Sequence, residues 1–297
     1  MKSQPKVTAG VICFNEEKNL TACIKSLINQ SYKNIEIVIS DNKSTDRSKK
    51  ILLGIKKQYP QIKMNFFPKN FGVGRNVLKV LEMSSANFFF FISPGDLIDK
   101  NFVKECMLIH SEKNVVSVMS SVSQKNQKKE VNVINFRGIK NFNNLSAFKQ
   151  ANIIRTFNAK KKKMKFNLFM LGIFNKSVLL NVIKVFKRKD LVIWNDRLVL
   201  FLVCMSGKLH HINKVLYTKF VDKRTARIHM YLEKTPLDLN SINLTIKSIF
   251  SIKKSSLFIK IKFALIIIKI AQYKIKRNLL DFLGLMRKKT LKLIKVN

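Results

Sequence analysis

The stretch that decides the fold is Asn87–Asp99, with the sequence NFFFFISPGDLID. Its five apolar residues, Phe88–Ile92, form a short continuous run, which is typical of a strand buried on both faces in the middle of a parallel sheet. The residues Ser93–Gly95 then predict a turn, and Asp96 follows directly. Because open α/β sheets bind ligands just beyond the carboxyl ends of their strands, we expect Asp96 to lie at a ligand site.

The chain before this stretch alternates strands with helices. Apolar runs predict strands at Val7–Cys13, Ile35–Ile39 and Ile62–Phe67, and apolar residues at helical spacing follow them at Leu20–Ile28, around Ile51–Ile55 and at Val77–Leu81. Asn15 is predicted to cap the first helix. Such alternation with short loops predicts right-handed βαβ units in a parallel sheet. Since parallel strands end at one edge, Phe14, Asn15, Asp41 and Asp96 are expected to converge there.

Four blocks of residues in this half resemble, in order and spacing, the motifs of the family 2 glycosyltransferases, which have the GT-A fold. The blocks are Val11–Glu17 (VICFNEE), Ile39–Asp46 (ISDNKSTD), Asn70–Asn76 (NFGVGRN) and Phe91–Asp96 (FISPGD). The resemblance covers the chain up to about residue 110. It implies an α/β protein with a mostly parallel central sheet flanked by helices, and an inverting transferase that uses a nucleotide-diphosphate sugar.

The resemblance also implies roles for single residues at the donor site. Phe14 is expected to line the nucleobase pocket, Glu16 to contact the nucleoside, and Asp41 to hydrogen-bond the base. An aromatic ring suits a flat base, and a carboxylate accepts a hydrogen bond from a base N–H group. Arg75 is expected to lie near the donor and to face a phosphate, and the expected donor is a UDP-sugar.

The fourth block departs from the family pattern. Ser93 and Gly95 replace acidic residues of the Asp-x-Asp turn, and Asp96 alone remains, so the turn reads Ser-Pro-Gly-Asp. A single carboxylate can still hold Mn²⁺ or Mg²⁺, because diphosphate oxygens and waters supply the other hard ligands. The resemblance therefore implies that Asp96 is the metal ligand.

The second half is expected to supply the acceptor site and the base. Residues 112–165 are polar and basic, and we interpret them as loops. The block ending at Asp196 resembles the family's Glu-Asp motif and implies that Asp196 is the general base, which must lie within hydrogen-bond reach of the attacking hydroxyl. The alternative is that Asp196 only caps the helix through Leu198–Met205, which is followed by a strand through Ile212–Leu216. Trp194 is either a platform for a sugar ring or a core aromatic residue.

The charge balance and the C-terminal part point to an anionic partner. The 297 residues include 57 Lys and Arg against 17 Asp and Glu, a formal charge of +40. Codon bias of an AT-rich genome or an anionic partner explains such an excess. Residues 236–297 are predicted to form a basic amphipathic tail that lies on an anionic membrane surface, or else docks on the catalytic domain. The predicted domain is 1–235, with a donor half (1–115) and an acceptor half (116–235).

The sequence therefore predicts a glycosyltransferase of surface-polysaccharide synthesis, such as that of lipopolysaccharide or capsule. The acceptor is expected to be a hydroxyl of a glycan or of a polyprenyl-diphosphate-linked sugar. The N-terminus reads as a strand and not as a secretory signal, so we expect a cytoplasmic protein, peripheral on the inner face of the cell membrane. The alternatives are a basic nucleic-acid-binding protein and a GT-A protein without catalytic activity; the chain shows no recognisable nucleic-acid-binding motif, so no nucleic-acid partner is expected.

Overall fold

The computed structural model describes residues 4–126, 131–134, 141–156, 170–184, 187–188, 191–192, 196–221 and 261. The chain divides into two compact units, Met1–Leu232 and Glu233–Asn297. All described residues but Ile261 belong to the first unit, so the predicted basic tail, residues 236–297, lies outside the described residues apart from Ile261. Among the residues that are described, no helix is both long enough and apolar enough to cross a membrane.

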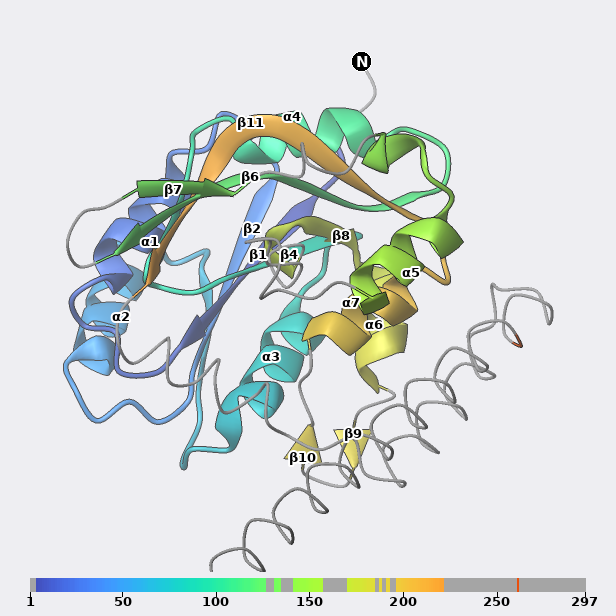
Figure 1. Ribbon diagram of the computed structural model, residues 1–297. Coiled ribbons are helices and arrows are strands. Elements are labelled where there is room, and N and C mark those ends of the chain that lie inside the picture. Colours follow the sequence, from blue (N-terminus) through green and yellow to red (C-terminus); the bar gives the residue numbers. More distant parts are fainter. Residues whose placement is uncertain are drawn as a thin grey trace, which may run out of the picture. The chain divides into compact units, whose positions relative to one another are not determined.

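The first half of the fold follows the predicted alternation (Figure 1). Its elements are β1 (Val7–Cys13), α1 (Leu20–Ile28), β2 (Ile35–Asp41), α2 (Ser48–Gln58), β3 (Lys63–Phe66), α3 (Gly72–Met83), β4 (Phe88–Ile92), β5 (Asp96–Ile98) and α4 (Phe102–His110). The apolar faces read from the sequence are the buried ones: Leu20, Cys23, Ile24 and Leu27 of α1 all lie in the core. The strands and helices predicted here are confirmed to within a few residues.

The second half contains more regular structure than predicted. Its elements are β6 (Val115–Asn126), β7 (Val131–Ile134), the 3-10 helix η1 (Phe142–Asn144), α5 (Ala147–Thr156), β8 (Ile173–Asn175), α6 (Lys176–Lys184), β9 (Lys187–Arg188), β10 (Leu191–Val192), α7 (Asp196–Val203) and β11 (Lys208–Val221). The interpretation of residues 112–165 as loops is wrong. Strand β6 was not predicted because buried serines, including Ser117 and Ser121, lie between its apolar residues and interrupt the period-2 pattern of a strand.

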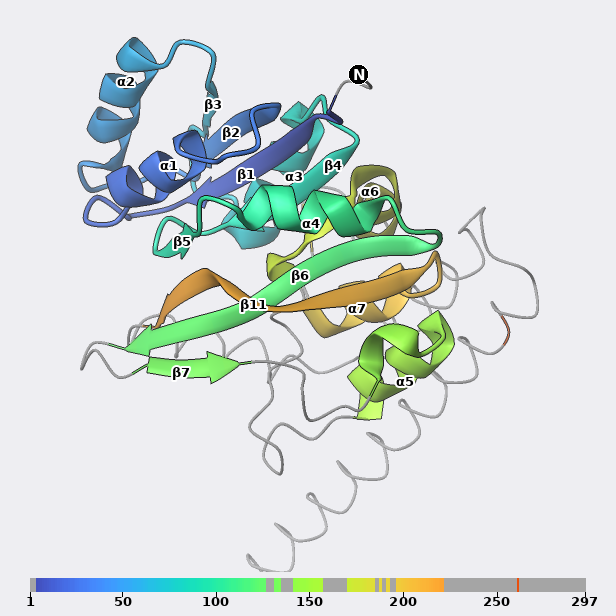
Figure 2. The ribbon, with the colours of Figure 1, turned by 90° about the horizontal axis from the view of Figure 1, so that it is seen from above.

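The main sheet of the described region has the strand order β3-β2-β1-β4-β8-β6-β11-β5, with β7 paired to β6. Strands β3, β2, β1 and β4 are parallel, as are β6 and β11, whereas β8 and β5 run antiparallel to their neighbours. Figure 2 shows β6 and β11 running side by side beyond the first four strands. The strand order reverses between β1 and β4, and open α/β sheets bind ligands beyond the carboxyl ends of the strands at such a switch point.

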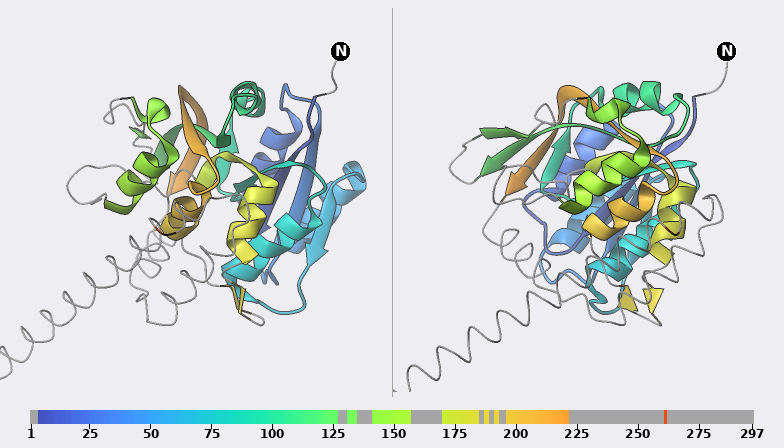
Figure 3. Two further views of the ribbon diagram at one scale, coloured as in Figure 1. Left: turned by 90° about the vertical axis from the view of Figure 1, so that its right-hand side faces the viewer. Right: turned by 45° about the vertical axis from the view of Figure 1, so that its right-hand side comes forward.

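Helices cover both faces of the sheet, with α4 on one face and α3 and α6 on the other (Figure 3). Strand β4 is buried between them, as its sequence predicted. The Phe90 ring packs edge-on against Phe102 of α4, with 5.6 Å between ring centroids. Its neighbour Phe89 points the opposite way and fills the space above Gly10, where an added Cβ would lie 2.3 Å from the ring and 3.1 Å from Val80 of α3.

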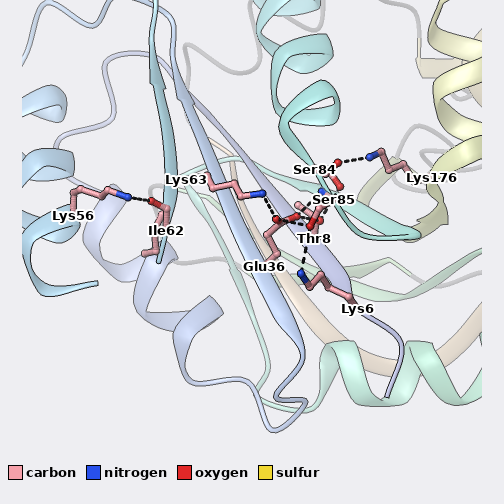
Figure 4. A network of polar contacts seen from close by, with 9 residues as sticks. All are labelled: Lys6, Thr8, Glu36, Lys56, Ile62, Lys63, Ser84, Ser85 and Lys176. Atoms are coloured by element: carbon pink, nitrogen blue, oxygen red, sulfur yellow. Dashed lines mark hydrogen bonds and ion pairs between the residues drawn. The ribbon is translucent and has the colours of Figure 1, made fainter. Parts of the chain in front are cut away.

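A polar network centred on Glu36 lies at the amino edge of the sheet, opposite the edge where β1, β2 and β4 end (Figure 4). The Glu36 carboxylate accepts hydrogen bonds from Lys63 (2.6 Å), from the Thr8 hydroxyl (2.6 Å) and from both the backbone N–H and the hydroxyl of Ser85 (2.8 Å each). Burial raises the pKa of Glu36, but these donors outweigh it and bring the pKa to about 2. The network joins the starts of β1, β2 and β3 to the end of α3.

Candidate active site

The loop after β1 is held to the loop after β2 by Asn15. Asn15 has a left-handed backbone (φ 55°), and its Oδ1 accepts a hydrogen bond of 2.7 Å from the backbone N–H of Thr45. Its own N–H donates to the Ser44 hydroxyl at 2.9 Å. The prediction that Asn15 caps the first helix is wrong, because α1 begins at Leu20 with Asn19 at its N-cap and the Asn15 side chain bridges two loops instead.

The backbone N–H groups at the end of the same loop also bind the second loop. The Glu16 N–H donates to the Ser48 hydroxyl at 2.9 Å, and the Glu17 N–H donates to the Asp46 carboxylate at 3.1 Å. The segment that carries Phe14 and Glu16 is therefore fixed against the start of α2. The surface between these two loops is therefore preformed, so a ligand does not need to order it on binding.

Asp41 stands at the end of β2, directly opposite Cys13 at the end of β1. It is buried, and its carboxylate accepts hydrogen bonds from the backbone N–H of Ser44 (3.1 Å) and from the Ser44 hydroxyl. Burial and the nearby Asp41 charge raise the pKa of the Cys13 thiol to about 12. A carboxylate offers about four lone pairs, so these bonds leave Asp41 capacity for one more donor.

The third block is tied to the second by a pair of asparagines. The Asn42 amide donates to Asn70 Oδ1 at 2.8 Å, and Asn42 Oδ1 accepts from the backbone N–H of Phe71 at 3.0 Å. Asn70 Oδ1 also accepts from Gly72 at 2.8 Å, and Gly72 has φ +81°, which a side chain rarely permits. The loops after β1, β2 and β3 therefore form one hydrogen-bonded rim.

Helix α3 begins at this rim and carries the last two residues of the third block. The Asn76 amide is buried and donates to the carbonyl oxygen of Cys13 at 3.2 Å. Arg75, the preceding residue, is partly exposed, and it makes no hydrogen bond or ion pair with the residues that the structure describes. Its guanidinium is therefore available to a ligand at the rim.

The fourth block forms a tight turn next to the first. The backbone N–H of Asp96 donates to the carbonyl oxygen of Ser93 at 2.8 Å, and Ser93 itself is exposed. The Cys23 thiol of α1 lies beneath, 3.6 Å from the Ser93 carbonyl oxygen. Burial raises the pKa of Cys23, and the charges of Asp96 and Glu16 add to this effect. Glu16 and Asp96, predicted from different blocks, therefore lie around the same thiol.

The Asp96 carboxylate does not point into solvent. Asp96 is 1% exposed; it accepts a 2.9 Å hydrogen bond from the Tyr217 hydroxyl and lies 3.7 Å from the Lys219 ammonium. Burial raises the pKa of the Asp96 carboxyl, while Lys219 and Tyr217 act in the opposite direction. Neither partner was predicted from the sequence: the i, i+2 spacing of Tyr217 and Lys219 places both on one face of a strand, but it does not identify Asp96 as the residue that they meet.

The sequence predicted Mn²⁺ or Mg²⁺ at Asp96, and the surroundings of this carboxylate do not fit a divalent cation. In the described ranges, no group of three or more His, Cys, Asp and Glu side chains is arranged to hold a metal ion. Asp96 Oδ2 accepts the hydrogen bond from Tyr217 and also faces Lys219, so a donor and a positive charge, which disfavour a divalent cation, stand at this oxygen.

Asp196 is the first residue of α7. Its side chain is outside the described residues, as is Trp194, so the two interpretations of Asp196, general base and helix cap, both stand. Among the predicted site residues, the structure brings Phe14, Glu16, Asp41 and Asp96 to one edge of the sheet through the register of β1 with β2 and β4.

The comparisons with known proteins agree with this fold and these blocks. The family model described as glycosyl transferase family 2 matches residues 8–180. A curated relative, the GalNAc(5)-diNAcBac-PP-undecaprenol beta-1,3-glucosyltransferase of Campylobacter jejuni, is 34% identical over 94 residues, which is 31% of this chain and 30% of that protein. The similarity thus spans about a third of this relative.

Two solved structures share the fold. Staphylococcus aureus TarS 1-349 in complex with UDP-GlcNAc aligns with a TM-score of 0.58 at 18% identity and covers 87% of this chain and 70% of that one. The mannosyltransferase PcManGT of Pyrobaculum calidifontis, in complex with GDP-Man and Mn²⁺, aligns with a TM-score of 0.54 at 13% identity, covering 89% and 70%. These neighbours and the mostly parallel sheet confirm the GT-A fold that the sequence predicted.

Proposed function

This chain belongs to glycosyl transferase family 2, and we propose that it is an enzyme that moves a sugar from a nucleotide-diphosphate donor to a hydroxyl group. The observation that carries the proposal is the rim at the carboxyl edge of the sheet. Loops after β1, β2 and β3 are joined by side-chain hydrogen bonds, and the Ser93–Asp96 turn lies beside them across the β1–β4 switch point. Open α/β sheets bind nucleotides at such an edge.

In this proposal the donor lies along the rim with its base at the β1–β2 end. Phe14 supports the base, Glu16 contacts the nucleoside, and Asp41 accepts a hydrogen bond from the base. Arg75 faces a phosphate, for which a guanidinium with unused donors is well suited. A UDP-sugar is the first donor to test, because a neighbour of this fold binds UDP-GlcNAc.

The proposed reaction is one displacement with inversion at the anomeric carbon. Asp196 takes the proton from the acceptor hydroxyl as its oxygen attacks, and the nucleoside diphosphate leaves with the bonding electrons. A positioned carboxylate in this role typically contributes about 10²–10⁴-fold to the rate. Asp196 is the first residue of α7, next to the position that caps the helix, so the test of the base must separate the two roles.

The acceptor in the proposal is a glycan or a polyprenyl-diphosphate-linked sugar of surface-polysaccharide synthesis. A relative's name includes a polyprenyl diphosphate, and the excess of Lys and Arg suits an anionic surface. The basic tail, residues 236–297, then holds a cytoplasmic enzyme at the inner face of the membrane. Sedimentation with vesicles containing phosphatidylglycerol, before and after removal of residues 236–297, tests this part separately.

The donor proposal is tested by a thermal-shift screen with UDP-, GDP-, dTDP- and CMP-sugars, each with Mn²⁺ and with EDTA. We expect one nucleotide series to raise the melting temperature, because a ligand that binds only the folded state stabilises it. Slow hydrolysis of that donor by the wild type then distinguishes an active enzyme from a GT-A protein without catalysis. No shift with any donor, together with steep salt-dependent binding to duplex DNA or RNA, contradicts the proposal.

A further inference from the structure

The environment of Asp96 is built by strand β11. Strand β5 pairs antiparallel with β11, and Lys219 stands directly opposite Asp96 in this register. On its other side, Lys219 pairs with Gln124 of β6, so the lysine backbone is held from both sides. The Tyr217 hydroxyl, the Lys219 ammonium and the backbone N–H of Phe220 all interact with the Asp96 carboxylate. These contacts of the Asp96 carboxylate are therefore all with residues of β11.

The charges of Asp96 and Lys219 can be compared with those of a metal-binding turn. A turn with two carboxylates becomes neutral when it binds one divalent cation. Here Ser93 and Gly95 are uncharged, and the single charge of Asp96 is balanced by the single charge of Lys219. The Lys219 ammonium therefore neutralises the turn with one carboxylate, as a divalent metal ion neutralises a turn with two carboxylates.

We propose that Lys219 supplies the positive charge that faces the diphosphate of the donor, in place of a divalent cation. This inference rests on the proposed donor site. An ammonium has three N–H donors, and its 3.7 Å ion pair with Asp96 occupies at most one of them. The Lys219 side chain is 13% exposed, so the protein does not enclose it completely. The remaining donors can bind phosphate oxygens.

Asp96 acts in this arrangement as a positioning residue. Its buried carboxylate holds the ammonium at the turn, and Tyr217 holds the carboxylate. The two accounts of Asp96 make opposite predictions. If Asp96 binds a metal ion, removal of its charge weakens diphosphate binding; if it only holds Lys219, removal of its charge leaves the ammonium unbalanced and strengthens the attraction to a diphosphate.

The experiment is calorimetric titration of UDP, GDP and dTDP, in EDTA and in Mn²⁺, into the full chain and its variants. Uridine, guanosine or thymidine serves as the matching probe without phosphates. We expect the wild type to bind one diphosphate in EDTA. Lys219→Met is expected to weaken that binding roughly tenfold or more, the usual loss for one hydrogen bond to a charged group, with nucleoside binding unchanged. Lys219→Arg is expected to retain most of the affinity, and Asp96→Asn to increase it in EDTA.

Lys214→Met is the matched control. Lys214 lies on the same strand and also pairs with a carboxylate, Glu105, at 2.9 Å, but its side chain is 61% exposed; its loss is expected to leave diphosphate binding as it was. Because Lys219→Met leaves Asp96 buried without a counter-charge, the double variant Asp96→Asn/Lys219→Met is measured as well. It removes both charges and is expected to fold and to bind weakly.

The outcomes are distinguishable. A wild type that binds a diphosphate only with Mn²⁺, or a folded Lys219 variant, single or double, that binds in EDTA as tightly as the wild type, overturns the inference and leaves the proposed function standing. A wild type that binds no diphosphate under either condition overturns both.

Discussion

Tyr217 and Asp96 are 121 residues apart in the sequence, and in the fold the Tyr217 hydroxyl donates a 2.9 Å hydrogen bond to the Asp96 carboxylate. Both residues are fully buried. The Tyr217 ring also packs edge-on against Phe102 of α4, with 5.9 Å between centroids, which fixes the hydroxyl in place. One side chain therefore joins the acceptor half of the predicted domain to the turn at the end of β4.

Tyr217→Phe is expected to lower the free energy of unfolding by about 1–3 kcal/mol, because it removes a donor from a buried carboxylate and leaves the packing intact. Urea unfolding at neutral pH measures the loss. Tyr59→Phe is the control, since Tyr59 is partly exposed and the described residues offer its hydroxyl no partner. Equal stability of the two variants contradicts the arrangement around Asp96.

Glu36→Gln tests the network at the opposite edge of the sheet. The pKa of Glu36 falls from 4.5 to about 2 on folding, so its charge stabilises the fold above pH 4.5 and this contribution disappears as the pH falls toward 2. After a discount for solvent screening, the contribution is about 1–2 kcal/mol. We expect the free energy of unfolding of the wild type to exceed that of the variant by this amount at pH 7 and by about a quarter of it at pH 2.5, which is still above the folded-state pKa.

The Glu36 experiment compares urea midpoints across this pH range. Glu82→Gln removes a carboxylate from an exposed position of α3 and is expected to show no such pH-dependent difference. A difference in the free energy of unfolding between the wild type and Glu36→Gln that stays constant with pH is incompatible with the lowered pKa of Glu36.

Two glycines are expected to respond in opposite ways to the same substitution. At Gly207 an added Cβ would lie 2.5 Å from the carbonyl oxygen of Asn114 and 2.5 Å from Val116, whereas at Gly54 in α2 nothing lies within 4 Å. Gly207→Ala is expected to destabilise the protein by about 1–3 kcal/mol, and Gly54→Ala to stabilise it by up to about 1 kcal/mol through helix propensity. Thermal unfolding of the two variants measures both; the same sign for both would show that Gly207, just before β11, does not approach Asn114 this closely.

Asp196→Asn separates the two roles of Asp196. Asparagine caps a helix about as well as aspartate does, but it cannot accept a proton. If Asp196 is the base, the variant keeps its stability and its affinity for the donor and loses about 10²–10⁴-fold in turnover. Transfer of labelled sugar from the donor to membrane lipid and glycan fractions measures turnover. Normal transfer by Asp196→Asn, with impaired stability in Asp196→Ala, assigns the residue to capping alone.

The parts of the fold that the sequence predicted are those that depend on short-range patterns. Strands β1 to β4 and helices α1 to α3 each carry their own apolar periodicity, and strand–helix alternation leaves few topologies. The convergence of Asp41 and Asp96 followed from parallel register alone. The positions of the motif residues were predicted from this pattern. The hydrogen bonds by which Asn15, Asn42 and Asn70 join the loops were found only in the structure.

The parts that the sequence did not predict depend on long-range pairing. The alternation of apolar and polar residues in β6 was not recognised, because the buried residues Ser117, Ser120 and Ser121 are polar and were interpreted as part of a loop. Strand β11 was expected to be short, yet it continues past Leu216 to Val221. That continuation brings Lys219 to Asp96, and no local pattern states that a lysine will meet a carboxylate from a distant strand.

The central claim is that the four blocks form one nucleotide site, and amide hydrogen exchange with and without the best-binding nucleoside diphosphate tests it most directly. We predict slower exchange together in residues 13–17, 41–46, 70–76 and 93–96, with little change in β7 and at the amino edge around Glu36. Protection confined to other segments, such as the lysine-rich face of α2, or protection of one block without the others, would contradict the account.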